Sequence, residues 1–344
     1  MNDTRAQALR QWLARTRPDA TGALAPVAGD ASLRRYFRVA TDDGASLVAM
    51  DAPPPAEDVG PFVDIGRRLA AAGVHVPAIL AADYEQGLLL LDDLGTALYL
   101  DHLDGDRAEW LYGDALTALV RMQTRTSVDG LPAYDAARLD AEMALFPTWW
   151  LAQHLGLDLA AARAALAPTR AALVAAALEQ PRVFVHRDYH SRNLMVTADR
   201  NPGVLDFQDA VSGPVTYDPV SLLRDCYIAW PQDRVAAWLE QYRQQARAAG
   251  LALPGGETLQ RWFDLMGVQR HLKAIGIFAR LWHRDGKARY LADIPRTWHY
   301  IERLFGRYAE LDPLAEYAQQ HRLGERLAQD SRAASAAPGP PGPA

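Results

Sequence analysis

Lysine is almost absent from this sequence, and cysteine is reduced to a single residue. The two lysines are Lys273 and Lys287, so residues 1–272 contain none. A G-x-x-x-x-G-K-[ST] phosphate-binding loop is therefore excluded, because alanine follows Lys287. The one cysteine, Cys226, excludes an internal disulfide framework and a cluster of thiolate metal ligands.

The chain also lacks a long apolar run and an excess of positive charge. No stretch of 18 consecutive apolar residues occurs, so we expect no membrane span. The net charge of −6 offers no basic surface for nucleic acid, and we expect no such partner. The first 17 residues carry several arginines and no apolar segment, which predicts no signal peptide. Together with the lone thiol, this favours a cytoplasmic protein.

Length and composition indicate a folded protein with two parts. The 344 residues exceed the usual size of one compact domain, which predicts two domains or one two-lobed unit. Apolar residues make up 49% and charged residues 23%, as in ordinary globular proteins. Residues 331–344 are rich in alanine, proline and glycine, and we expect a disordered tail there.

Secondary-structure patterns change near residue 95. Before it, the periodicity predicts helices over residues 5–17 and 59–72, and strands over residues 36–40, 46–50 and 88–91. After it the chain is mostly helical, with residues 159–178 expected to form a helix pair because Pro168 interrupts them. The other helices are predicted over residues 108–123, 138–153, 219–229, 234–249, 259–284 and 296–308.

One strand-like island, residues 183–207, lies inside the helical part. Strands are predicted over residues 183–185, 194–197 and 204–207, with a turn between the last two. Polar side chains follow the ends of these strands: His186, Asp188, Asn193 and Asp206. Two carboxylates and an amide brought together are suitable oxygen ligands for Mg²⁺, whose other positions are filled by phosphates and water.

The spacing of these residues is that of a kinase catalytic loop. His186, Asp188 and Asn193 form H-x-D-x-x-x-x-N, and Asp206-Phe207 follows as the metal-binding pair. With HRDYHSRN and VLDFQDA, the chain resembles the aminoglycoside-phosphotransferase family of kinase-like small-molecule kinases. The resemblance implies an α+β, protein-kinase-like two-lobe fold: a β-rich N-lobe over residues 1–94 and a mainly helical C-lobe over residues 95–330.

The resemblance also implies cofactors and residue roles. ATP and Mg²⁺ are the expected cofactors, with Asn193 and Asp206 as the metal ligands. Asp188 matches the aspartate that orients the attacking hydroxyl and accepts its proton. His186 is the other catalytic-loop candidate, and its expected role is to hold the loop by hydrogen bonds. Asp92 and Leu94 follow the last N-lobe strand, where backbone groups would meet adenine.

The N-lobe departs from the family at the phosphate-binding residues. Residues 29–36 precede a strand as a phosphate-covering loop should, with Gly29 and Ser32 as candidates, but they hold only one glycine. Met50 stands where the family usually places its nucleotide lysine. Either an arginine replaces that lysine, or the protein is a degenerate, non-catalytic nucleotide binder. The arginine candidates are Arg34, Arg35 and Arg38.

The predicted helix over residues 259–284 carries a basic stripe beside its apolar one. Lys273 and Gly276 share the stripe, and Arg270 and His271 lie close to it. The stripe is either a solvated face or a ligand-binding surface, and the glycine would permit close approach. Farther back along the chain, Asp218 followed by Pro219 has the pattern of a helix N-cap, with direct contact to a ligand as the alternative.

The fuller pattern resembles one branch of the family, the anomeric N-acetylmuramate/N-acetylglucosamine kinases of bacterial cell-wall recycling. It includes GDASLRRYFRV, PGVLDFQDAVSGPVTYD and GVQRHLKAIGIFARL. A basic stripe favours a neutral or anionic acceptor over a polycationic aminoglycoside. Kinases of choline, homoserine or an antibiotic are the alternatives, and we expect a monomer. The substrate candidates are Glu142, Trp149, His190, Arg192, Arg270, His271 and Lys273.

Overall fold

The computed structural model describes residues 4–27 and 33–327. Residue packing divides the chain into two units: Met1–Ser127 with Arg192–Ala210, and Val128–Ser191 with Val211–Ala344. This division differs from the lobe boundary at residue 94 that the resemblance implies, and that boundary stays a prediction. The predicted disordered tail, residues 331–344, lies outside the described residues.

The first unit contains a five-stranded antiparallel sheet in the order β1-β2-β3-β5-β4. Short apolar runs bounded by turn sequences form the strands here. Three strands match predictions within a residue, whereas β1 and β4 were missed. The strands are β1 (Ala25–Val27), β2 (Arg35–Ala40), β3 (Ser46–Asp51), β4 (Ile79–Asp83) and β5 (Leu88–Asp92).

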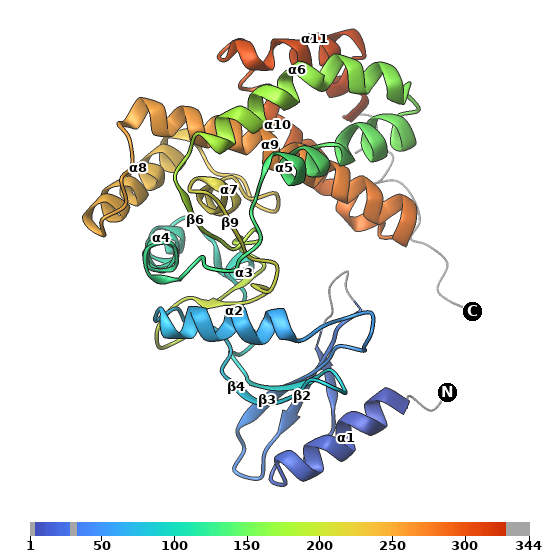
Figure 1. Cartoon of the computed structure of the whole chain (residues 1–344), viewed down its shortest axis with the longest axis vertical. Coiled ribbons are helices and arrows are strands. Elements are labelled where there is room, and N and C mark those ends of the chain that lie inside the picture. Colours follow the sequence, from blue (N-terminus) through green and yellow to red (C-terminus); the bar gives the residue numbers. More distant parts are fainter. Residues whose placement is uncertain (1–3, 28–32, 328–344) are drawn as a thin grey trace. The chain divides into compact units, whose positions relative to one another are not determined.

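The two faces of this sheet are covered by different elements (Figure 1). Helix α1 (Thr4–Thr16) buries Leu9, Trp12 and Leu13 against one face. That face presents Leu47 and Ala49 of β3, because successive strand residues point to opposite sides. On the other face, helix α2 (Gly60–Ala71) places Gly66 against Ile79 and Phe207. Phe207 therefore lies on the face of the sheet opposite α1.

The rest of the first unit contains two helices and a short hairpin. The helices are α3 (Tyr99–His102) and α4 (Arg107–Arg125). The hairpin joins β7 (Leu194–Met195) and β8 (Gly203–Val204) in antiparallel register, so the predicted hairpin is confirmed with shorter strands. Its turn is fixed by Asn201, whose amide donates to the Tyr99 hydroxyl at 2.7 Å and to Asp114 at 2.8 Å.

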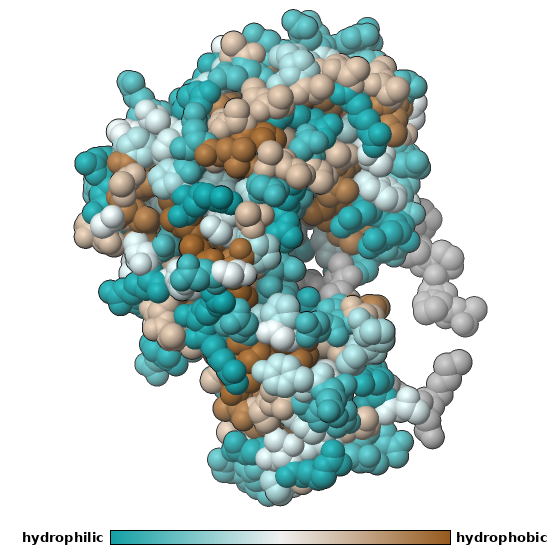
Figure 2. Space-filling view, in the orientation of Figure 1, coloured by the Kyte–Doolittle hydropathy of each residue, from teal (hydrophilic) through white to brown (hydrophobic). Residues whose placement is uncertain are grey.

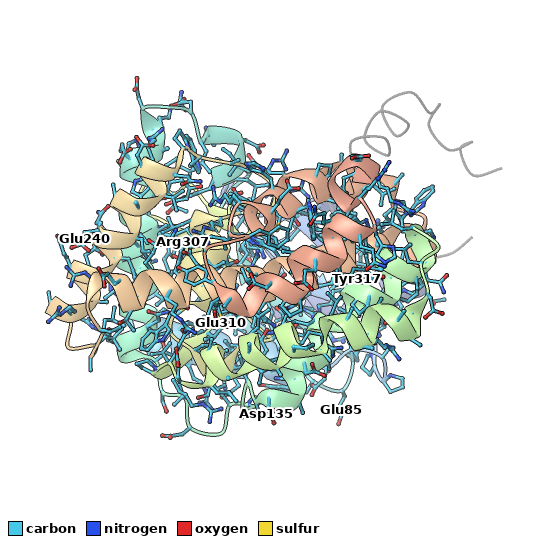
Figure 3. The ribbon with its side chains drawn as sticks, turned by 90° about the horizontal axis from the view of Figure 1, so that it is seen from above. Glu85, Asp135, Glu240, Arg307, Glu310 and Tyr317 are labelled. Carbon is cyan, nitrogen blue, oxygen red and sulfur yellow. The ribbon has the colours of Figure 1, made fainter. Side chains whose placement is uncertain are left out.

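The second unit is mainly helical around α9 (Gly256–Asp285), with one strand pair, β6 (Arg182–Val185) and β9 (Val211–Pro214). Helix α9 packs against η1, α6, α7 and α10, and α11 lies along α6 with Tyr317 turned into the core (Figure 3). The remaining helices are α5 (Ala136–Met143), η1 (Phe146–His154), α6 (Leu159–Leu178), α7 (Tyr217–Leu223), α8 (Gln232–Ala248), η2 (Ala288–Asp293), α10 (Ile294–Glu302), η3 (Ala309–Leu311) and α11 (Asp312–Gln320).

Helix α6 corrects one sequence prediction. It runs unbroken through Pro168, so the expected helix pair is wrong. Leu166 and Leu173 are buried on either side of the proline, and this packing against α9 and α11 sustains the helix across the missing hydrogen bond. By length and composition alone, α6 is long and apolar enough to cross a membrane. We interpret α6 instead as a helix of the packed unit, because Leu166 and Leu173 belong to its core. The visible surface of the molecule mixes hydrophilic and hydrophobic residues (Figure 2).

Candidate active site

Two buried carboxylates hold the loop that carries Asp188 in the second unit. Asp218 accepts hydrogen bonds from the backbone N–H groups of His186, at 2.7 Å, and Arg187, at 3.0 Å. Asp225 accepts from the backbone N–H of Ser191 at 2.9 Å and from its hydroxyl at 2.6 Å. Such buried, charge-assisted bonds fix the loop at both ends. Arg187 has a φ of +78°, a conformation that needs this support.

The expectation that Asp218 caps a helix is therefore wrong. Helix α7 begins at Tyr217 and its N-cap residue, Thr216, makes no side-chain cap bond. Asp218 instead lies fully buried with its carboxylate on the loop that carries Asp188. Burial and the nearby charge of Asp188 raise the pKa of Asp218 to about 7, although the two N–H donors oppose the rise.

Asp188 is surrounded by cationic side chains. Burial disfavours its ionised form, but Lys273, His190, Arg270 and Arg187 together hold its pKa below the ordinary value. Asp188 is therefore ionised at neutral pH and able to accept a proton or a hydrogen bond. The backbone of Asp188 is also held in place, because its N–H donates to Nδ1 of the buried His186 at 3.2 Å.

Glu142 of α5 is the anionic centre of a buried network beside this loop. It accepts hydrogen bonds from Arg187 and from the Tyr134 hydroxyl, and it lies 3.2 Å from the Lys273 Nζ. Lys273 also donates to the Tyr217 hydroxyl at 3.1 Å. Despite burial, the cations keep the pKa of Glu142 low, and Tyr217 and Glu142 keep the pKa of Lys273 raised. Glu142 therefore fixes two cations that face Asp188.

Arg270 is a buried cation with few partners. One terminal nitrogen contacts the Cys226 sulfur at 3.5 Å, and its buried Nε has no hydrogen-bond partner among the described residues. Burial lowers the pKa of Arg270, but Cys226, Tyr217 and Asp188 outweigh it, and the net shift is upward. A buried guanidinium with an unsatisfied N–H donor destabilises the folded state. An anionic ligand is the acceptor best suited to this donor.

The other substrate candidates of this unit have different surroundings. The His271 ring stacks on Tyr300 at 4.9 Å, and its Nε2 lies 2.9 Å from the Arg224 carbonyl oxygen. Its contacts are thus with Tyr300 and Arg224, and burial holds its pKa well below the ordinary value. Trp149 packs against the helical core. His190 places its ring edge-on to Tyr227, at 5.3 Å, and contributes charge to the surroundings of Asp188.

The first unit brings the two predicted metal ligands together. The Asn193 amide nitrogen lies 3.5 Å from Asp206 Oδ2, and Gln208 Nε2 donates to Asp206 Oδ1 at 2.8 Å. The Gln208 amide oxygen is buried without a hydrogen-bond partner among the described residues. The side-chain oxygen atoms of Asn193, Asp206 and Gln208 are of the kind that a hard divalent cation such as Mg²⁺ prefers. Asp206 adopts a φ of +58°, a strained conformation of the kind that clusters at functional sites.

Within residues 4–27 and 33–327, no three histidine, cysteine, aspartate or glutamate side chains form a metal-binding group. A set with few protein ligands still fits Mg²⁺, because this ion usually takes only one or two carboxylates and completes its shell with phosphate oxygens and water. The residues present therefore fit Mg²⁺ bound together with a nucleotide.

The predicted nucleotide residues also belong to the first unit. Asp92 ends β5 and accepts a hydrogen bond from the Ala78 backbone, and Leu94 lies against Gly203. Arg34, Arg35 and Arg38 each pair with a different carboxylate, from Glu57, Asp51 and Asp93 respectively. Arg192, proposed for the substrate, falls in this unit as well. Gly29 and Ser32 lie outside the described residues.

Sequence reasoning missed several residues that shape the site. Asp218 and Asp225 hold the loop, and Tyr134 and Arg187 bind Glu142. Arg187 sits between His186 and Asp188, so its place in the motif was a usable signal. The others are separated from the loop, residues 186–193, by 25 to 52 positions in an otherwise ordinary sequence, and no spacing rule links them.

Comparison with known proteins agrees with this architecture. The structure of Plasmodium vivax ethanolamine kinase matches with a TM-score of 0.63 and 11% identity, over 86% of this chain and 87% of that one. The fold is thus the α+β, protein-kinase-like fold of small-molecule kinases, as predicted. The sequence model of the phosphotransferase enzyme family matches residues 23–262. The chain belongs to this family.

Two curated relatives are closely similar over nearly their whole length. The N-acetylmuramate/N-acetylglucosamine kinase of Pseudomonas aeruginosa is 51% identical over 327 residues, covering 92% of this chain and 96% of the relative. The kinase of the same name from Pseudomonas putida is 49% identical, covering 94% and 99%. The chain is accordingly a phosphotransferase, and its kinase relatives imply ATP as the donor and a small molecule as the acceptor.

Proposed function

We propose that this enzyme transfers the γ-phosphate of ATP to the anomeric hydroxyl of N-acetylmuramate, N-acetylglucosamine or both, in the recycling of cell-wall sugars. The observation that carries the proposal is the cationic environment of Asp188, formed by Lys273, Arg270 and Arg187. The names of the relatives at 51% and 49% identity support the same substrate class.

The charge around Asp188 argues against the alternative acceptors. Choline and aminoglycosides are cations, and they would be repelled by a site in which buried Arg270 and Lys273 face the acceptor. N-acetylmuramate carries a lactyl carboxylate, and a site with an unused guanidinium donor can bind it. N-acetylglucosamine is neutral and is tolerated.

In the proposed mechanism, the ionised Asp188 orients the acceptor hydroxyl and takes up its proton. The hydroxyl oxygen forms a bond to the γ-phosphorus, the bond from that phosphorus to the bridging oxygen breaks, and ADP leaves with the electron pair. Because the transition state for phosphoryl transfer is loose, positioning and charge neutralisation account for most of the catalysis. Asp218 and Asp225 contribute by keeping the loop rigid.

We assign Mg²⁺ binding to Asn193 and Asp206, whose side-chain amide and carboxylate lie close together in the first unit. Bound with the nucleotide, the ion would neutralise negative charge on the phosphates. Gln208 holds Asp206 through its amide nitrogen. Its amide oxygen has no partner among the described residues and is suited to a water of the metal shell.

Phosphorus NMR of the product tests the acceptor assignment. With ATP and either sugar, we expect a phosphate signal that couples to the anomeric proton and disappears on mild acid treatment. A stable 6-phosphate, or no transfer to either sugar, would refute the assignment of the acceptor. A panel with choline, homoserine and an aminoglycoside serves as the comparison.

Arg270 should discriminate between the two sugars. In Arg270→Met, which keeps the side-chain volume, the KM for N-acetylmuramate should rise about 10- to 100-fold, the worth of one charge-assisted pair. The KM for N-acetylglucosamine, which lacks the carboxylate, should change less than about threefold. Steady-state kinetics with both sugars make the comparison. Equal losses for both would remove Arg270 from carboxylate recognition.

We further propose that the enzyme works as a monomer in the cytoplasm. The buried thiol of the single cysteine, Cys226, is consistent with a reducing compartment. Sedimentation at micromolar concentration tests the oligomeric state, and a dimer would contradict it.

A further inference from the structure

The triphosphate of ATP carries several negative charges, and the first unit contains no lysine to balance them. Mg²⁺ balances only part of the charge, so an arginine is the candidate side chain for the rest. Three arginines lie in or next to β2. Their positions in the sheet and their ion pairs distinguish them.

Arg35 lies on the face of the sheet that α1 covers. It pairs across the strands with Asp51, and paired residues share a face. Asp51 is fully buried and binds Arg35 at 2.6 Å together with Arg5 of α1. Phe207, which precedes Gln208 and follows Asp206, lies on the opposite face. Arg35 therefore ties α1 to the sheet.

Arg38 lies on the face opposite α1, and its guanidinium forms several bonds at the end of β2. Its Nε and one terminal nitrogen bind the Asp93 carboxylate, and that terminal nitrogen also donates to the Gly95 carbonyl oxygen at 2.9 Å. Asp93 additionally accepts a hydrogen bond from Ser46 at 2.7 Å. This bidentate arrangement holds the segment that follows β5 and uses most of the guanidinium donors.

Arg34 differs from both. It precedes β2 directly, and strand alternation places it on the face of Tyr36 and of Met50, which pairs with Tyr36. Glu57, in the segment before α2, accepts from its Nε at 2.9 Å, and both side chains are largely buried, at 14% and 17% exposure. Among the described residues Glu57 thus holds the guanidinium by one edge, which leaves the terminal nitrogens for another anion.

The charge of Arg34 is coupled to the metal-binding carboxylate. Burial lowers its pKa, while Glu57, Tyr36 and Asp206 raise it, with a net upward shift. Asp206 is therefore near enough to act electrostatically on Arg34. A cation beside the metal carboxylate and oriented by a second acid is well placed for phosphate oxygens.

We propose that Arg34 is the side chain that binds the phosphates of ATP in this enzyme, and that Glu57 is the positioning residue that orients its guanidinium. Met50, which occupies the expected lysine position and is fully buried, then has only a packing role. The inference rests on the proposed function, because it takes ATP as the phosphoryl donor.

Direct binding by the full-length protein tests the proposal. ADP in Mg²⁺ and adenosine are titrated calorimetrically into the wild type, Arg34→Ala, Arg34→Lys and Glu57→Gln. Arg17→Ala is the matched control, because Arg17 belongs to an exposed ion pair with Asp19. Arg34→Ala should weaken ADP binding about 10- to 100-fold and leave adenosine binding within about twofold. Arg34→Lys should recover part of the loss, and Arg17→Ala should bind as the wild type does.

Steady-state kinetics separate a positioning role from a structural one. Arg34→Ala and Glu57→Gln should raise the KM for ATP, with a smaller effect for Glu57→Gln, while the KM for the sugar stays within about twofold. Breaking this largely buried pair should also lower the melting temperature without nucleotide, so the kinetics are compared at a temperature where both variants remain folded.

Several results would overturn the proposal. ADP binding by Arg34→Ala equal to that of the wild type, or equal losses of ADP and adenosine, would exclude a phosphate contact. A phosphate-specific loss in Arg35→Ala or Arg38→Ala instead would move the contact to that residue. Wild-type kinetics in Glu57→Gln would remove the positioning role. A wild type that binds no ATP would refute the proposed function itself, before any variant is compared.

Discussion

Replacing Asp188 by asparagine should lower kcat at least about 1,000-fold and leave the affinity for ATP in Mg²⁺ within about threefold. The lost group acts on the acceptor hydroxyl, and general-base contributions of this size are typical. The loop should keep its conformation, because Asp218 and Asp225 hold its backbone and the variant retains the N–H that donates to His186. Single-turnover transfer and calorimetric ATP binding give the two readouts.

Asp135→Asn is the matched control for this variant. Asp135 caps α5 by accepting from the Arg138 N–H at 2.9 Å, and asparagine caps a helix equally well. The control should therefore retain the wild-type kcat and stability. If Asp188→Asn kept more than about a tenth of kcat, Asp188 would have neither the base nor the orienting role, and another group would have to supply it.

The pH dependence gives an independent check on Asp188. Its cationic neighbours hold its pKa below the ordinary value, so the carboxylate is already deprotonated at mildly acidic pH. A base must be deprotonated to act, so kcat would fall only as the pH drops through that lowered pKa. We expect no acid limb from Asp188 between about pH 5 and pH 8. If kcat of the wild type fell between pH 8 and pH 5, and this fall were absent in Asp188→Asn, the assigned charge state of Asp188 would be wrong.

The motif could be predicted from the sequence because it is local. Residues 186–206 contain their strands, turn and polar residues within about 20 positions, and strand ends dictate where those side chains emerge. The hairpin was confirmed, and the two predicted metal ligands meet at its base. Short strands with weak patterns were missed: β4 is an edge strand of intermediate burial, and β9 contains glycine and proline.

The cationic network could not be predicted, because it depends on long-range packing. Glu142 and Lys273 lie 131 positions apart, and only the contact between α5 and α9 brings them to 3.2 Å. The sequence identified the stripe of α9 that includes Lys273 and Gly276 but could not say what it faces. Gly276 was expected to permit close approach, and the group that approaches is the backbone before η1. A solvated face is excluded for Lys273, which is buried.

Replacing Gly276 by alanine should destabilise the protein by ~3 kcal/mol or more, the upper range for forced overpacking. A Cβ at this position would lie 2.4 Å from the carbonyl carbon of Leu145 and 2.6 Å from the backbone nitrogen of Phe146. Both are main-chain atoms, so no flexible side chain can move aside. Helix α9 and η1 would have to separate, in the part of the unit where Phe146, Trp150 and Ile275 form the core.

Gly267→Ala is the matched control, because Gly267 is also buried within α9. Its Cβ would meet only the end of the Arg224 side chain, at 3.2 Å, with the next atom at 3.8 Å. Alanine improves helix propensity by about 1 kcal/mol over glycine, which offsets this mild crowding. The urea midpoint of Gly267→Ala should therefore stay near that of the wild type, while that of Gly276→Ala should fall clearly.

The same displacement should also impair the active site. Lys273 lies one turn before Gly276 on α9, and Glu142 belongs to α5, the helix that precedes η1 in the chain. Separating α9 from η1 would therefore pull the Lys273–Glu142 pair apart. Turnover of Gly276→Ala at a temperature where it is still folded should fall, with the KM for the sugar raised more than the KM for ATP. A variant with the urea midpoint and sugar KM of the wild type would show that η1 and α9 do not pack this closely. The cationic network would then need another support.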